Sequence, residues 1–121
     1  DPHCCDPFYR KAIRVSVGAV LRTPLAIMEP LEAISALQAS GRRIYALSPS
    51  AARDLNQSDP SEPAAIVVGS EGPGLTDDIL AACEPLGIPM AGGFDSLNVA
   101  ATTAVALNHF TQQARSTDMR P

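Results

Sequence analysis

The chain has 121 residues, of which 45% are apolar, and carries a formal net charge of −4. This length predicts one domain with its own core, and no uninterrupted apolar run approaches the roughly 20 residues that cross a bilayer. The first residues lack the basic and apolar regions of a signal peptide. Three cysteines, two of them adjacent, argue against a disulfide framework and fit a reducing compartment, so we expect a cytoplasmic protein without a membrane partner.

Charge is distributed unevenly along the chain. Residues 1–53 hold seven basic and four acidic side chains, whereas residues 54–121 hold two basic and nine acidic ones. A chain of this net charge is no general binder of nucleic acid, because non-specific affinity grows with the number of phosphates neutralised. Any RNA contact would be local, and the candidates, which could equally solvate a helix face, are Arg10, Lys11, Arg14 and Arg22.

The first third of the chain predicts two helices and two strands. Asp6 can cap a helix that has Pro7 at its first position and ends near Gly18. A short strand is expected over 25–28, a helix from 29 to 41, and a second strand over 44–47. The interval 48–63 is rich in proline and serine and reads as a long loop with one helical turn near residues 51–55.

The second half contains two loops rich in glycine. The apolar run 64–68 predicts a buried strand, which breaks at the turn 69–74 and leads into a helix over 76–84. The chain returns through 88–90 and turns again at 91–95. Ser96 can then cap a helix that runs from Leu97 to Phe110. Strands and helices alternate throughout, which predicts an α/β fold with a mostly parallel sheet and helices on both faces.

The two glycine loops are expected at the same end of neighbouring strands, where they would form a pocket. Their glycines can be simple tight turns, or they can let a planar ligand approach the backbone at the sheet edge where α/β folds bind small molecules. The loops match neither the phosphate-binding P-loop nor the dinucleotide-binding spacing. A nucleoside without a phosphate tail is the better fit. The glycines concerned are Gly69, Gly72, Gly74, Gly92 and Gly93.

Two motifs in this region resemble those of one enzyme family. Val68–Leu75 has the form of a strand ending in a G-x-E-G-x-G-L turn, and Ile88–Gly92 with Ser96–Ala100 has the form I-P-M-x-G followed by S-L-N-V. The segments Cys5–Arg10 and Arg14–Ala19 match the region that precedes them. In this order and spacing, the motifs resemble the SpoU (TrmH) family of RNA 2'-O-ribose methyltransferases, which belongs to the SPOUT superfamily.

The resemblance implies a SPOUT-type fold with a deep C-terminal trefoil knot that binds S-adenosylmethionine, and a homodimer with its active site at the subunit interface. It also implies methyl transfer to a ribose 2'-hydroxyl of tRNA or rRNA. The family's first motif, with an Asn and the Arg that serves as base, is expected upstream of Asp1. We therefore expect residues 1–111 to form a partial methyltransferase domain that binds the donor without catalytic competence, and residues 112–121 to form a flexible tail.

The resemblance also assigns the site residues. The methyl donor is expected to contact Leu47, Gly69, Gly74, Ile88, Met90 and Leu97. The residues assigned to catalysis are Glu71, Ser96 and Asn98. Glu71 would orient the ribose or a catalytic arginine, and the other two would hold the active-site geometry through hydrogen bonds. Without the resemblance, the apolar members read as core residues and Glu71 as a solvated turn residue.

Other residues give weaker indications of function. Residues 3–6 (His, Cys, Cys, Asp) are consecutive and lack a second ligand pair at zinc-like spacing, so no metal site is expected. Cys83 is expected in the core and His109 at the surface or an interface. Two alternatives to the methyltransferase remain open: a non-catalytic S-adenosylmethionine-binding or dimerisation module of the same fold, and an unrelated nucleotide-binding α/β domain.

Overall fold

The computed structural model describes residues 1–90 and 97–117. The chain divides into two compact units, residues 1–33 and residues 34–121, and each is described by itself. Among the helices of the described part, none is both long and apolar enough to cross a membrane. The three strands found among these described residues all belong to the second unit.

The first unit contains the helix α1 (Arg10–Val15) and the 3₁₀ turn η1 (Ala19–Leu21). The predicted start at Pro7 was wrong: the Asp6 Oδ1 atom accepts the Phe8 N–H at 2.9 Å, so Asp6 stabilises a turn ahead of the helix. The helix ends before Val17 and Gly18, whose φ angles are 51° and 76°. The strand predicted over 25–28 does not form among the described residues of this unit.

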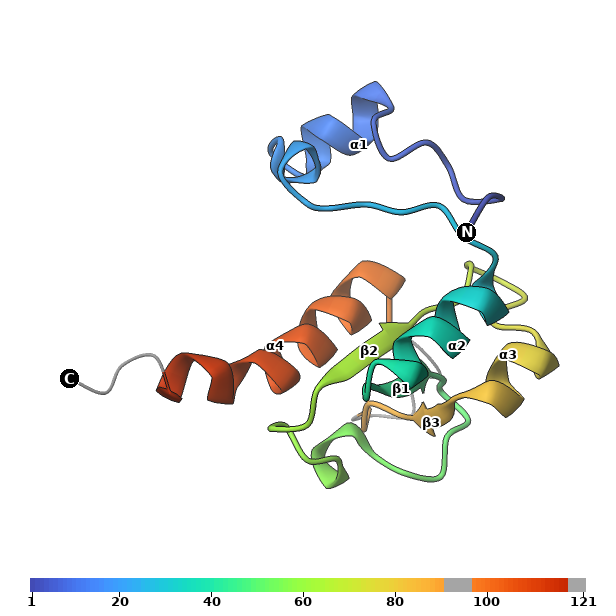
Figure 1. Cartoon of the computed structure of the whole chain (residues 1–121), viewed down its shortest axis with the longest axis vertical. Coiled ribbons are helices and arrows are strands. Elements are labelled where there is room, and N and C mark those ends of the chain that lie inside the picture. Colours follow the sequence, from blue (N-terminus) through green and yellow to red (C-terminus); the bar gives the residue numbers. More distant parts are fainter. Residues whose placement is uncertain (91–96, 118–121) are drawn as a thin grey trace. The chain divides into compact units, whose positions relative to one another are not determined.

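The second unit is built on a parallel sheet of β1 (Arg43–Leu47), β2 (Ala64–Val67) and β3 (Glu84–Leu86) in the order β2-β1-β3 (Figure 1). The predictions of a parallel α/β sheet and of strands over 44–47 and 64–68 are confirmed, although β2 is half-buried rather than buried. The strand β3 was missed, because Glu84 was assigned to the end of the preceding helix and the next two residues were read as a connection to the segment 88–90. Since β1 lies between β2 and β3, the two glycine loops do not follow neighbouring strands, which corrects the sequence interpretation.

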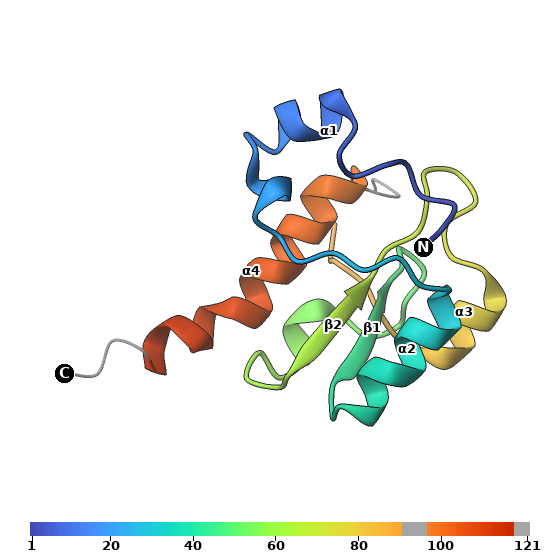
Figure 2. The ribbon, with the colours of Figure 1, turned by 45° about the horizontal axis from the view of Figure 1, so that its top comes forward.

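Helices cover both faces of this sheet (Figures 1 and 2). The helix α4 (Val99–Thr117) packs against β2 and against the turn η2 (Leu55–Gln57), and the rings of Tyr45 and Phe110 stack at 5.2 Å. Because side chains alternate along a strand, the neighbours of Tyr45 point to the opposite face. That face carries α2 (Pro30–Ala39) and α3 (Asp77–Ala82), where the Gln38 Nε2 group donates to the Ala82 carbonyl at 3.0 Å.

The core on the α4 side is small and centred on β1. Its buried members are Tyr45, Leu55, Leu86 and Ala106. Tyr45 is fully buried, and burial together with the hydrogen bond that its hydroxyl donates to Glu62 raises the pKa of the phenol. Cys83, which was expected in the core, is only half-buried and is not among these core residues; burial raises the pKa of its thiol.

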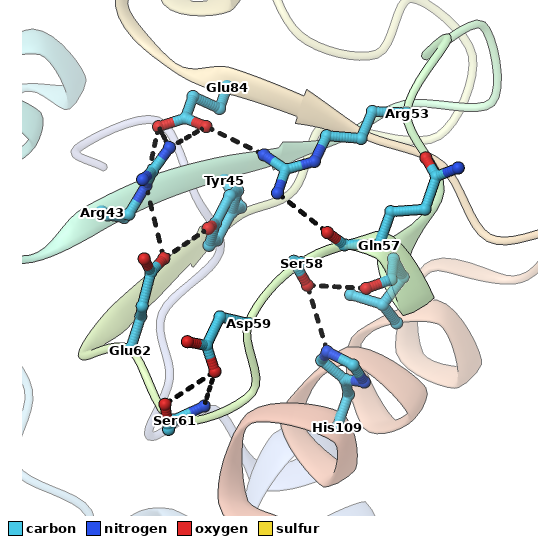
Figure 3. Close-up of polar contacts among 11 residues, drawn as sticks. Arg43, Tyr45, Arg53, Gln57, Ser58, Asp59, Ser61, Glu62, Glu84 and His109 are labelled. Atoms are coloured by element: carbon cyan, nitrogen blue, oxygen red, sulfur yellow. Dashed lines mark hydrogen bonds and ion pairs between the residues drawn. The ribbon is translucent and has the colours of Figure 1, made fainter.

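The segment between β1 and β2 is more ordered than its composition indicates. Its helical turn lies at Leu55–Gln57, later than predicted, and is stabilised by a capping box between Asp54 and Gln57. Ser58 is buried and its hydroxyl donates to the Leu55 carbonyl at 2.6 Å. The same Ser58 Oγ atom lies at hydrogen-bond distance, 3.0 Å, from His109 Nε2 (Figure 3), so His109 holds this segment against α4.

Charged side chains at the amino ends of β1 and β3 form a network (Figure 3). Arg43 donates to both carboxylate oxygens of Glu84 at 2.5 Å and lies 3.5 Å from Glu62. The Arg43 and Glu84 side chains are 45% and 43% exposed, and ion pairs with this exposure contribute about 0–1 kcal/mol each. The network therefore sets geometry at this edge more than it adds stability.

Candidate functional site

A pocket of about 1030 Å³ lies at the carboxyl edge of the sheet. It is lined by the segments that follow β1, β2 and β3 and by the residues around the beginning of α4. The carboxyl edge is where open α/β sheets bind ligands, and this volume is at the upper end for small-molecule sites. All of the described lining residues belong to the second unit.

The pocket brings together most of the residues singled out from the sequence. Its lining includes all six residues expected to bind the methyl donor, namely Leu47, Gly69, Gly74, Ile88, Met90 and Leu97. Two of the three residues assigned to catalysis, Glu71 and Asn98, line it as well. Ser96, like Gly92 and Gly93, lies outside the described residues.

The loop after β2 requires its glycines for two different reasons. A Cβ atom on Gly69 would lie 2.6 Å from the backbone nitrogen of Leu75 and would also overlap the backbone of Gly74. Gly72 and Gly74 instead have φ angles of 97° and 73°, which favour glycine. The Gly74 N–H donates to the Ser70 carbonyl at 3.2 Å and closes the loop. These features give a tight loop whose backbone lies at the pocket.

Asn98 caps the helix that borders the pocket. Its Oδ1 atom accepts the Ala100 N–H at 2.9 Å, and α4 begins at Val99. The predicted helix start at Leu97 was therefore wrong by two residues. Because the cap uses the side-chain oxygen, the amide NH₂ group of Asn98 remains available as a donor; it has no protein acceptor within the part of the chain that the structure describes.

The sequence interpretation missed one wall of the pocket. The loop after β1 contributes Ser48, Ser50 and Asp54, and the Ser48 and Ser50 hydroxyl oxygens lie 3.0 Å apart. Only Leu47 was assigned to the site from this part of the chain. The other residues of this wall could have been found from their position alone, because the residues that follow parallel strands gather at the same edge of the sheet.

The charge in the pocket is acidic. Asp54 and Glu71 are the charged side chains among the described lining residues, and that lining contains no lysine or arginine. A ligand with several phosphates would therefore meet repulsion, whereas a cationic ligand would be attracted. Within residues 1–90 and 97–117, no group of three His, Cys, Asp or Glu side chains is placed to hold a metal ion. This lining suits a nucleoside that carries a positive charge and no phosphate groups.

Comparisons with known proteins agree with this geometry. An uncharacterized tRNA/rRNA methyltransferase of Mycobacterium bovis is 41% identical over 120 aligned residues, which cover 93% of this chain and 40% of that protein. The AdoMet-bound rRNA methyltransferase from Sinorhizobium meliloti matches with a TM-score of 0.81 at 28% identity, over 89% of this chain and 42% of that one. An RNA 2'-O ribose methyltransferase matches with a TM-score of 0.80 at 28% identity, over 92% of this chain and 43% of that one.

The chain spans about two fifths of the length of the curated relatives that it matches. The model of the SpoU rRNA Methylase family matches residues 1–108, a range that includes the loops after all three strands and the beginning of α4. This match confirms the resemblance inferred from the two motifs. The chain belongs to the SpoU rRNA methylase family.

Proposed function

We propose that this chain supplies the methyl-donor site of an S-adenosylmethionine-dependent enzyme that methylates a ribose 2'-hydroxyl of tRNA or rRNA in the cytoplasm. The observation that carries the proposal is the convergence of both family motifs on one pocket, through Gly69, Ile88 and Leu97. The printed names of the relatives and structural neighbours, which include an RNA 2'-O ribose methyltransferase, support the reaction class.

The pocket residues fit the proposed donor. Leu47, Ile88, Met90 and Leu97 offer apolar surface for the adenine ring, and the glycine loop offers backbone groups that no side chain covers. The lining contains acidic and no basic charged side chains among its described residues, which favours a ligand that carries a positive charge. When bound, S-adenosylmethionine supplies a methyl group activated by its sulfonium sulfur.

The proposed roles of the polar residues follow from their surroundings. Glu71 lies on the glycine loop at the pocket and would orient the acceptor ribose or a catalytic arginine. Asn98 is held by its cap to Ala100, so its NH₂ group can donate to a group in the pocket from a fixed position. Ser96 is proposed to support the same geometry on the strength of the family motif.

We further propose a C-terminal trefoil knot and a homodimer, both on the basis of the family. The apolar side chains of Val105 and Leu107 on α4 are 45% and 50% exposed, and a second copy could cover them. Sedimentation velocity measures this directly: a dimer supports the proposal, and a monomer at high protein concentration contradicts it.

Methyl transfer provides the functional test. The family's first motif, with the Arg that serves as base, is not among these residues, so we expect the 121-residue chain to transfer no methyl group by itself. A longer protein in which that motif precedes Asp1 is expected to label bulk tRNA or rRNA from radiolabelled S-adenosylmethionine. Digestion of the RNA should then release labelled 2'-O-methylnucleosides.

Three outcomes would change the proposal. Label in a methylated base would contradict ribose as the acceptor. Donor binding without transfer to any RNA, in a protein that carries the first motif, would instead indicate a non-catalytic module of the same fold. Transfer by the 121-residue chain alone would show that the base lies within it.

A further inference from the structure

The loops that follow β1 and β3 are joined at the pocket. The Ser48 N–H donates to the Leu86 carbonyl at 3.0 Å, the Gly87 N–H to the Arg53 carbonyl at 2.8 Å, and the Leu55 N–H to the Gly87 carbonyl at 2.7 Å. Both backbone groups of Gly87 are thus held by the segment 53–55. The position of Gly87, and of the pocket residues that follow it, depends on that segment.

The Arg53 side chain fixes this segment from outside the pocket (Figure 3). Its Nη2 atom donates to the Gln57 carbonyl at 3.0 Å, and its Nη1 atom donates to Glu84 Oε2 at 3.2 Å. One planar guanidinium group therefore connects the last residue of η2 to the first residue of β3. The backbone of the same residue binds Gly87, at the other end of β3.

We propose that Arg53 is a positioning residue for donor binding. Its side chain ties the turn at Gln57 to the start of β3, its carbonyl holds Gly87, and Gly87 leads directly into Ile88 and Met90 of the pocket. Arg53 is not among the residues that line the pocket. This inference rests on the proposed function, because it assigns a role in the donor site proposed above.

Arg43 provides a matched comparison. It binds the same Glu84 carboxylate with three hydrogen bonds against one from Arg53, and the two arginine side chains are similarly exposed, at 45% and 41%. Its other ion-pair partner is Glu62, whereas Arg53 contacts the turn at Gln57. Removing Arg43 therefore takes away three hydrogen bonds to Glu84 but leaves the contacts of Arg53 with Glu84 and with the turn at Gln57.

The test measures the dissociation constant for S-adenosylhomocysteine by calorimetry, with the melting temperature of each variant. Arg53→Met is expected to weaken binding about fivefold, the effect of losing exposed polar contacts of this kind. Arg43→Met should bind within about twofold of the wild type. It loses more hydrogen bonds to Glu84 than Arg53→Met does, so its melting temperature should be equal to or lower than that of Arg53→Met. Arg53→Lys should recover part of the affinity, because an ammonium group can reach Glu84 without bridging to Gln57.

Equal losses of affinity in Arg53→Met and Arg43→Met, or affinities that simply follow the melting temperatures, would overturn the role of Arg53. An unchanged dissociation constant in Arg53→Met would do the same. Failure of the folded wild-type chain to bind S-adenosylhomocysteine would reject the donor pocket itself and, with it, any positioning of that pocket by Arg53.

Discussion

Replacing Gly69 with alanine is expected to cost about 3 kcal/mol of unfolding free energy, the upper part of the usual range for added atoms in a packed site. The new Cβ atom would lie 2.6 Å from the Leu75 nitrogen and would overlap the backbone of Gly74, and backbone cannot move aside as a flexible side chain can. The loop would have to open against the hydrogen bond between Gly74 and Ser70. Because this loop lines the pocket, affinity for the donor should fall at least about tenfold.

Gly72→Ala is the matched control for this prediction. Gly72 lies in the same loop with a φ of 97°, and a Cβ atom there meets nothing within 4 Å. Its cost is conformational strain alone, about 1–2 kcal/mol for an alanine in the left-handed region. Urea unfolding of the two variants should rank Gly69→Ala as the more damaging. An equal or reversed ranking would mean that the loop does not close tightly around position 69.

Tyr45→Ala is expected to destabilise the chain by about 3–5 kcal/mol, the range for removing a large aromatic side chain from a core. Tyr45 is fully buried in the middle strand and stacks on Phe110 of α4 at 5.2 Å, so its loss leaves a cavity between sheet and helix. For a domain of ordinary stability, about 5–15 kcal/mol, this removes a large share of the total. Thermal and urea unfolding followed by circular dichroism would measure the change.

Tyr45→Phe separates the contribution of the aromatic ring to stability from that of the hydroxyl group. It keeps the stack on Phe110 and removes the hydrogen bond to Glu62, which measures 3.1 Å. We expect a loss of about 0.5–1.5 kcal/mol, the net contribution of one hydrogen bond. If Tyr45→Ala were no more destabilising than Tyr45→Phe, the core between β1 and α4 would not be the main source of stability in this unit.

The features that could be predicted from the sequence are those that depend on residues close together in the chain. The apolar runs at β1 and β2 and the glycines at 69–74 are short-range signals, and the structure has strands and a tight loop at these places. The strand β3 was missed because it is three residues long, includes Pro85 and follows a helix directly. Its identity depends on pairing with Tyr45–Leu47, which lie about forty positions earlier in the chain. Proline is tolerated there because β3 lies at one edge of the sheet that the described strands form.

The site was predicted as far as its motifs extend. Eight assigned residues line the pocket, and seven of them lie within the two family motifs, whereas the wall from Ser48 to Asp54 carries no motif. Backbone hydrogen bonds between Gly87 and the segment 53–55 hold that wall, and His109 holds Ser58 just after it. Composition cannot reveal contacts between residues so far apart in the chain. The helix start shows the same limit: Ser96 and Asn98 are both good caps, and the backbone geometry selects Asn98.

Calorimetric titration of the 121-residue chain with S-adenosylhomocysteine would show whether the pocket binds the methyl donor. We predict one site per chain, retained in Leu97→Met and abolished in Leu97→Arg, which would place a charged group at the pocket. Leu97 is 42% exposed, so circular dichroism should show that Leu97→Arg remains folded. A folded wild-type chain that fails to bind, or binding that survives in Leu97→Arg, would mean that this pocket is not the donor site.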